Sequence, residues 1–326
     1  DRTFSNVHNV SGMLLLNRST ESVSGGKDVD HRYQGMTGQF AYNYASKYFG
    51  EFNFGYNGSE NFAKGHRYGF FPAGSIGWII SKEKFMQKTS SWLDLLKIRA
   101  SLGWVGSDKL PSGRFAYLAY YGSGDSYNFG DQNFNTNVGG WGEQTFGNPN
   151  LTWEKAKKTN IGIDLSVLKH KLELSIDLFQ ENRYHIITSL SGDDKLGFPS
   201  MVGRDAPYVN SGRVKNHGID FELTIRGNVG RDFNWMVRPN FTCAKNKVIY
   251  ENEIPREYEW RQETGHELYL NYLYVFDHFV KDQAEADKLN AEKYQPWGIL
   301  IPGDVVYKDL NGDGKITDLG DRKRMG

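Results

Sequence analysis

The chain has 326 residues and a formal net charge of zero, since 39 acidic side chains balance 39 basic ones. This balance gives no electrostatic reason to expect a nucleic-acid partner. The mean hydropathy of −0.61 and the lack of a long charge-free apolar run exclude a transmembrane helix. The single cysteine, Cys243, excludes an internal disulfide.

Alternating apolar and polar residues recur along the chain and predict an all-β protein. A period of two places successive side chains on opposite faces of a strand. No sustained helical period appears, apart from a short helix expected within residues 83–96. The pattern predicts about nine strands, within residues 10–15, 39–44, 51–56, 75–80, 96–102, 161–167, 172–178, 219–225 and 233–242.

The predicted hairpin of residues 161–178 shows the two faces most clearly. One face is aliphatic, from Ile161 to Val167 and from Leu172 to Leu178, whereas the other carries carboxylates and hydroxyls. In a soluble sheet the aliphatic face packs on a core, whereas in an outer-membrane barrel it faces lipid and the polar face lines a wet lumen. The polar face predicted for the whole sheet carries charges of both signs, at Lys97, Arg99, Glu173, Asp177, Asp220, Glu222 and Arg238.

The connections between the predicted strands alternate strictly between short and long. An up-and-down sheet puts alternate connections at opposite ends, and outer-membrane barrels have tight turns at one end and long extracellular loops at the other. A β-sandwich has no reason to sort its loops in this way. We therefore predict that residues 1–326 are part of one antiparallel up-and-down transmembrane β-barrel. The short links are 45–47, 83–94, 168–170 and 227–232, the long links are 20–30, 58–66, 107–149, 189–207 and 251–303, and the predicted extracellular loops are 108–150, 188–208 and 251–303.

Several segments resemble, in order and spacing, the SusC/RagA family of TonB-dependent outer-membrane transporters. They are YGFFPAGSIGWIISKEKFM (68–86), LLKIRASLGWVGS (95–107), GNPNLTWEKAKKTNIGIDL (147–165), NSGRVKNHGIDFEL (210–223) and PGDVVYKDLNGDGKITDLGDRKRMG (302–326). The resemblance implies a bacterial outer-membrane barrel of roughly 22 strands with a plugged lumen. It also implies import of a large nutrient, usually a glycan, together with a SusD-like surface lipoprotein and the TonB–ExbB–ExbD complex. We expect this chain to be a piece of such a transporter, whose plug domain, TonB-contacting segment and closing strands lie elsewhere.

Catalysis is not predicted, because the histidines are scattered and no HExxH motif, nucleophile elbow or Cys/His pair appears. We expect a protein that contacts membrane lipid, moves its substrate unchanged and needs no cofactor. Three alternatives stay open here: a soluble secreted β-protein that binds or hydrolyses glycans, a structural or adhesive barrel, and a peptide importer of the same family.

Residues 304–326 contain a motif that suits a calcium loop. Oxygen ligands at positions 1, 3 and 5, a glycine at 6 and a carbonyl at 7 resemble an EF-hand loop. The acid expected at position 12 is replaced by Gly320, with acids one place later and two places earlier. The alternative is a metal-free turn, since Asp, Asn and Gly favour turns. The candidate calcium residues are Asp309, Asn311, Asp313, Lys315, Asp318 and Asp321.

Aromatic residues make up 14% of the chain, and many lie in the predicted loops. Rings with a polar edge can stack on sugar rings or pack against a partner protein. The alternative is that these rings pack the loops against each other. The candidate substrate-binding residues are Tyr120, Tyr121, Trp141 and Trp260.

Overall fold

The computed structural model describes residues 2–5, 7–22, 29–111, 113–130, 135–191, 195, 197, 199–230 and 232–325. The chain divides into two compact units, Asp1–Asn252 and Glu253–Gly326. None of the helices among the described residues combines the length and the apolar character that crossing a membrane would need.

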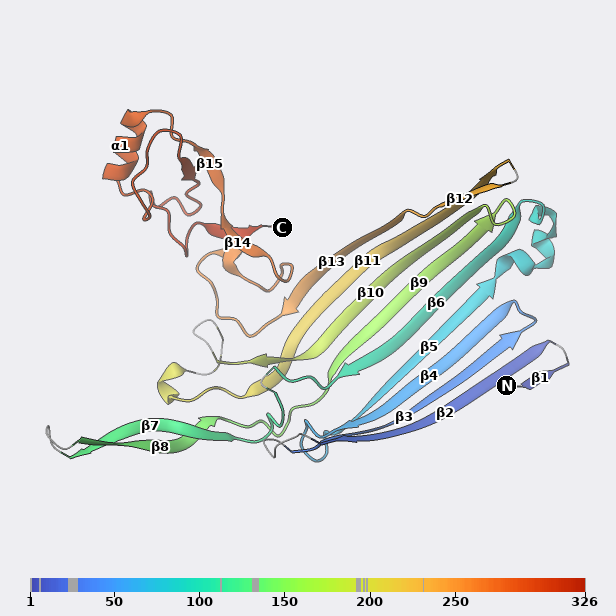
Figure 1. The fold of residues 1–326 in the computed structure, drawn as a ribbon, viewed down its shortest axis with the longest axis horizontal. Coiled ribbons are helices and arrows are strands. Elements are labelled where there is room, and N and C mark those ends of the chain that lie inside the picture. The colour runs from blue at the N-terminus through green and yellow to red at the C-terminus, as the bar shows by residue number, and fades with distance from the viewer. Residues whose placement is uncertain are drawn as a thin grey trace. The chain divides into compact units, whose positions relative to one another are not determined.

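The first unit is built on an open antiparallel sheet of eleven strands (Figure 1). From β1 to β12 each sheet strand pairs with the next sheet strand along the chain, and β9 lies next to β6 because β7 and β8 form a separate hairpin; β13 pairs with β11. The sheet strands are β1 (Arg2–Phe4), β2 (His8–Glu21), β3 (His31–Tyr44), β4 (Tyr48–Ser59), β5 (Tyr68–Ile79), β6 (Leu93–Ser107), β9 (Glu154–Val167), β10 (Leu172–Ser189), β11 (Tyr208–Val229), β12 (Phe233–Val237) and β13 (Asn240–Tyr250).

All nine predicted strands are present, and the last is split in two. Both β12 and β13 pair with β11, and the break between them falls at Arg238 and Pro239. Proline has no backbone N–H to donate to a ladder, so the pairing stops there and resumes beyond it. Strands β12 and β13 therefore form one edge with an interruption.

The connections are sorted by end, as the sequence predicted. Figure 1 shows tight turns at one end of the sheet and long segments at the other. The turn end holds residues 45–47 and 168–171, together with the 3₁₀ helices Ile80–Lys82 and Lys84–Thr89. The helix expected within residues 83–96 is thus a short 3₁₀ helix. Parts of the predicted loops 108–150 and 188–208, and most of the link 20–30, lie outside the described residues.

One face of the sheet is apolar, and its aliphatic side chains are exposed, with no second layer of described residues from the same unit over them. The register places Leu165 beside Leu174, and Leu174 beside Leu223, so aliphatic rows run across neighbouring strands. Leu16 and Ile76 on this face are 74% and 68% exposed. A sheet in a soluble protein would bury such a face against a second layer of structure. Exposed aliphatic rows are instead typical of a wall that faces lipid.

Aromatic rings border the apolar face near both ends of the strands. Tyr44, Tyr48 and Trp78 stack in a row at the turn end, with centroids 6.2 Å apart in each step. Tyr56 and Tyr68 stack at 5.2 Å near the other end. Tyr48 and Tyr56 are eight residues apart on β4, which is about 27 Å along the strand. With a tilt of about 40° this spans roughly 20 Å of membrane, close to the apolar band of outer-membrane barrels.

The polar tips of the aromatic row at the turn end are held by Glu83. Its carboxylate accepts hydrogen bonds from Tyr48 Oη at 2.8 Å and Trp78 Nε1 at 3.2 Å, and Lys47 Nζ lies at 3.1 Å. These donors, the Tyr48 hydroxyl first, lower the pKa of Glu83. The short link between β5 and β6 reverses the chain and, through Glu83, also fixes the aromatic row at the turn end.

Two segments predicted as loops contain elements of their own. Within residues 108–150, β7 (Tyr120–Gly130) and β8 (Asn135–Thr145) form a hairpin. The second unit joins residues 253–325 around Val280, Ala286, Leu300 and Val306. Its elements are the 3₁₀ helix Glu259–Arg261, the helix α1 (Gln283–Ala291) and the strands β14 (Asn271–Tyr274), β15 (Phe276–Phe279), β16 (Val305–Tyr307) and β17 (Arg322–Met325).

Candidate functional site

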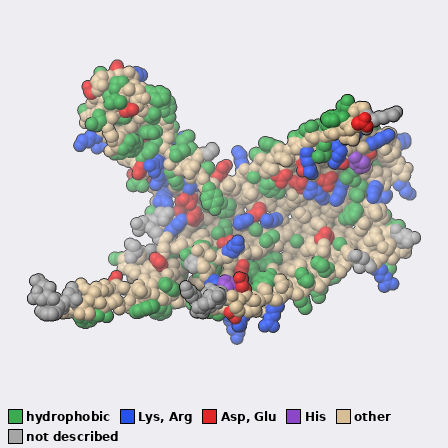
Figure 2. Space-filling view, viewed as in Figure 1, with side chains coloured by type: hydrophobic (Ala, Val, Ile, Leu, Met, Phe, Trp, Pro, Cys, Tyr) green, Lys and Arg blue, Asp and Glu red, His purple; other side chains and the backbone are tan. Residues whose placement is uncertain are grey.

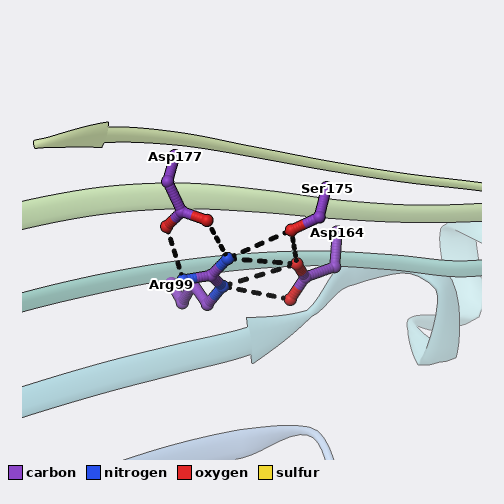
Figure 3. A network of polar contacts seen from close by, with 4 residues as sticks. All are labelled: Arg99, Asp164, Ser175 and Asp177. Atoms are coloured by element: carbon purple, nitrogen blue, oxygen red, sulfur yellow. Dashed lines mark hydrogen bonds and ion pairs between the residues drawn. The ribbon is translucent and has the colours of Figure 1, made fainter. Parts of the chain in front are cut away.

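The polar face of the sheet carries a hydrogen-bonded charge network at its centre (Figure 3). Arg99 on β6 lies between Asp177 on β10 and Asp164 on β9. Its two terminal nitrogens each donate to a different oxygen of Asp177 at 2.6 Å, and Nε lies 3.2 Å from Asp164. Ser175 Oγ donates to Asp164 at 2.9 Å. A planar guanidinium suits this two-pronged contact with a carboxylate.

Gly162 makes room for the Arg99 side chain. A Cβ atom at this position would lie 2.6 Å from Arg99 Cζ and 2.8 Å from Asp177 Oδ1. Both contacts are closer than real Cβ atoms approach, so any larger residue would displace the guanidinium. The glycine in the segment Ile161–Gly162–Ile163 is therefore explained by packing on the polar face.

Other charges on the polar face are paired in the same way. Lys158 lies 3.3 Å from Glu181, Arg226 lies 2.8 Å from Glu173, and Arg238 bonds Glu222. Figure 2 shows side chains of both signs gathered on this face over β10 to β12. The register puts all the charges predicted for the polar face of β9–β11 on one side, and Asp177 stands directly opposite Asp220. The wall is polar, with its charges largely paired.

At the long-loop end of the sheet, aromatic residues form a buried cluster. Phe62, Phe71 and Trp153 pack together, with centroids 5.6 and 5.3 Å from the Trp153 ring. Trp153 Nε1 donates to the carbonyl of Arg67 at 3.0 Å. Leu151 is fully buried in the same cluster. Leu151 and Trp153 thus pack the loops against the ends of the strands.

Residues 147–150 form a turn that is held by hydrogen bonds of Asn148. Asn148 Oδ1 accepts from the backbone N–H of Asn150 at 3.0 Å, which makes an Asx turn. Asn148 Nδ2 donates to the carbonyl of Tyr208 at 2.7 Å, so the same side chain ties this turn to the start of β11.

Three of the four predicted substrate-binding aromatics lie together on the hairpin β7–β8. Tyr120, Tyr121 and Trp141 are 64%, 63% and 80% exposed. Trp260 lies in the second unit, where it stacks on Tyr258 at 5.0 Å. The Trp260 Nε1 atom is buried and has no hydrogen-bond partner among the described residues. Trp260 is therefore packed within its unit, whereas the hairpin presents free ring faces.

The loop of residues 309–321 in the second unit is held by hydrogen bonds from its own backbone N–H groups to aspartate side chains. Asp309 accepts from the N–H groups of Gly312 at 2.6 Å and Gly314 at 2.7 Å. Asp321 is fully buried and accepts from the N–H groups of Leu310 and Thr317, both at 2.7 Å. Asp321 therefore closes the loop onto its beginning.

The remaining predicted calcium residues divide into two groups. Asp313 accepts from the Lys315 N–H at 2.8 Å and from Asn311 Nδ2 at 3.0 Å. These three residues are therefore hydrogen-bonded to one another within the loop. Asp318 instead accepts from the Tyr274 hydroxyl and lies 3.2 Å from Arg322. Burial, and then the bond to Asp318, raise the pKa of Tyr274. Among the described residues, no cluster of three or more His, Cys, Asp or Glu side chains could hold a metal.

A family model for the barrel of TonB-dependent receptors, described as "TonB dependent receptor-like, beta-barrel", matches residues 28–307. The chain belongs to this family. TonB-dependent receptor P3 of Formosa agariphila is 30% identical over 304 residues, which cover 89% of this chain and 28% of that protein. TonB-dependent receptor SusC of Bacteroides thetaiotaomicron is 27% identical over 289 residues, covering 87% of this chain and 27% of SusC. The chain thus spans less than a third of these relatives.

The fold of this TonB-dependent receptor barrel also matches a solved structure of the RagAB peptide importer in its open-open state. The TM-score is 0.71 at 17% identity, over 99% of this chain and 36% of the importer chain. The predicted SusC/RagA resemblance and the all-β barrel fold are therefore confirmed. The protein is an outer-membrane protein, and the soluble secreted alternative is wrong.

The sequence missed two members of the charge network in this barrel, Asp164 and Ser175. Their role depends on register, because Asp164 stands opposite Ser175 on β10 and opposite Lys97 on β6. Aligning the hairpin of residues 161–178 about its turn would have revealed the first pairing. The second requires knowing that β6 and β9 are neighbours across a long insertion.

Proposed function

We propose that this chain forms part of the barrel wall of a SusC/RagA-type transporter that imports a large nutrient across the outer membrane. The observation that carries the proposal is the sheet's division into an exposed aliphatic face and a polar face with paired charges. A passage for a polar cargo needs wet walls inside and apolar walls towards lipid. The protein would move its cargo without altering it.

The proposed cargo is a glycan. Tyr120, Tyr121 and Trp141 present exposed rings on one hairpin, and such rings stack on the apolar faces of sugars. A peptide is the second candidate, because the RagAB proteins, whose fold this chain shares, are described as a peptide importer. The proposed partners are a SusD-like surface lipoprotein and the TonB–ExbB–ExbD complex, since SusC and RagAB are among the proteins that this chain resembles.

Replacing Trp141 with alanine in the full-length transporter is expected to weaken oligosaccharide binding by roughly two- to tenfold, the value of one aromatic contact. The cargo would first be identified by growth on a panel of glycans and peptides, and the affinity then measured by titration calorimetry. Val138→Ala on the same hairpin removes an apolar group without a ring and should bind normally. Equal affinities for wild type and Trp141→Ala would contradict the assignment, and growth on peptides alone would replace glycan by peptide.

We further propose that residues 309–315 hold a structural Ca²⁺ ion. The donors fit in kind, because Asp309, Asn311 and Asp313 supply oxygens and the Lys315 carbonyl would complete the series. Gly312 and Gly314, with φ of +77° and +82°, give the loop its tight turn. Asp318 is already bonded to Tyr274 and Arg322, so we assign it no ligand role. Asp321 would orient the loop through its backbone bonds.

Removing calcium with a chelator is expected to increase hydrogen exchange in residues 309–321 of the full-length protein, and re-adding Ca²⁺ should restore protection. Asp309→Asn should abolish the calcium response, because it weakens the first ligand. Asp287→Asn on α1 changes the charge of the same unit outside the loop and should leave the response intact. Unchanged exchange in wild-type protein on chelation would show that the turn is metal-free.

A further inference from the structure

Basic residues follow the aliphatic rows on the lipid-facing side of the sheet, at its long-loop end. On β9, Ile163 and Ile161 share this face with Lys157 and Lys155, because all four are odd-numbered on one regular strand. Lys157 lies four residues beyond Ile161, about 13 Å further along the strand. Its long stem can cover apolar surface while the ammonium reaches the membrane boundary.

The same change from apolar to basic residues occurs on two further strands, β11 and β13, which are neighbours of each other. On β11, Ile219 is followed towards the long-loop end by His217, Lys215 and Arg213. On β13, Cys243, which stands opposite Ile219, is followed by Lys245 and Lys247. Three separate strands therefore change from apolar to basic on the same face, in the same direction.

The register brings these basic residues together in rows. Lys215 stands directly opposite Lys247, and His217 stands directly opposite Lys245. Asn182 on β10 separates Lys215 from Lys157 in the first of these rows. Like charges directly opposite each other on adjacent strands are destabilising. An anion bound between these side chains would offset the repulsion.

No carboxylate of the described residues offers this compensation. Within the described ranges, Lys155, Lys157, Lys215, Lys245 and Lys247 form no ion pair with an acidic side chain, although Lys157 lies over the Trp104 ring at 5.6 Å. The polar face behaves differently, since Arg99 there neutralises two aspartates. The residues between the lysines on β10 are Gln180, Asn182 and Tyr184, which carry no negative charge.

We propose that this basic surface binds phosphate groups on the headgroups of lipids in the leaflet at the long-loop end. The surface, defined as Lys155, Lys157, Arg213, Lys215, Lys245 and Lys247, lies where headgroups meet a barrel whose aliphatic rows contact acyl chains. A phosphorylated lipid satisfies both parts at once, with its chains on the aliphatic rows and its phosphates among the lysines. The proposal depends on the outer-membrane location and is independent of the cargo.

The test compares the full-length protein with the variant Lys157→Gln/Lys215→Gln/Lys247→Gln, which removes one row of charge. The control, Lys84→Gln/Lys88→Gln/Lys169→Gln, removes three exposed charges at the turn end. The probes are diphosphorylated and monophosphorylated lipid A in detergent, with binding measured by native mass spectrometry and by the shift in Tm. Inorganic phosphate serves as the free-ion arm.

We expect the row variant to bind diphosphorylated lipid at least about tenfold more weakly than wild type, and the control to bind normally. Without lipid, the row variant should melt at the same temperature as wild type or higher, because its like-charge repulsion is relieved. Equal lipid binding by wild type and the row variant would overturn the proposal. A loss of binding as large in the control would also overturn it, as would a Tm increase with inorganic phosphate as large as that with lipid.

Discussion

An arginine in place of Ile163 is expected to destabilise the folded protein in a bilayer by about 2–4 kcal/mol. Ile163 lies within the aliphatic run of β9, flanked across the sheet by Ile98 and Ile176. The charged side chain would have to enter hydrocarbon, and neighbours on both sides are apolar. Reversible unfolding by urea in liposomes measures the change.

The matched control for Ile163→Arg is Asn160→Arg on the same strand. Asn160 lies on the polar face, opposite Ser101 and Phe179. A guanidinium there would enter water, so the expected change in unfolding free energy is below about 1 kcal/mol. Similar losses for the two variants would mean that the two faces do not differ in their surroundings, and would contradict the assignment of lipid and lumen sides.

Replacing Arg99 with methionine is expected to lower the unfolding free energy by about 1–3 kcal/mol, since it leaves two carboxylates without their cation. The side chains of Arg99, Asp164 and Asp177 are 33%, 26% and 19% exposed, so water screens part of the loss. The loss of stability should arise mainly from repulsion between the two carboxylates that no longer have a cation between them. Lost packing should contribute less, because methionine fills much of the same volume.

A double-mutant comparison separates these causes. Adding Asp177→Asn to Arg99→Met removes one of the unpaired charges and should recover part of the lost stability. Asn53→Ala, which removes a hydrogen bond to Glu51 elsewhere on the polar face, should show no coupling with Arg99→Met. If Asp177→Asn and Arg99→Met were additive, the network would carry no interaction energy.

Strand positions and the two faces could be predicted because lipid and water impose opposite requirements on alternate residues. The strands are longer than predicted, since β11 extends over Tyr208–Val229. Beyond the aliphatic rows both faces are wet, as at His217 and Lys215, and the alternation that marks a strand disappears there. The register of the hairpin was accessible from its short turn at residues 168–170.

Elements within the long loops could not be predicted for a different reason. The helix α1 has the sequence QAEADKLNA, in which apolar residues are too few to mark a face. It is positioned instead by Asp282, which accepts from the Glu285 N–H, and by its own Ala286, which is buried against Val280, Leu300 and Val306. The hairpin β7–β8 is rich in glycine and exposes its aromatics, so its pattern is that of a loop. The Arg99 network depended on the neighbourhood of β6 and β9, which no local pattern encodes.

The native thiol of Cys243 offers the most direct test of the two-faced wall. Cys243 lies on the lipid-facing side of β13 opposite Ile219, whereas Thr242 lies on the polar side opposite Asp220. A nitroxide would be attached to Cys243, or to Thr242→Cys in a Cys243→Ser background, in the full-length protein in liposomes with other thiols removed. We predict that relaxation by oxygen dominates at Cys243, and relaxation by a water-soluble nickel chelate at position 242. Equal accessibility to the chelate at both positions would contradict the account.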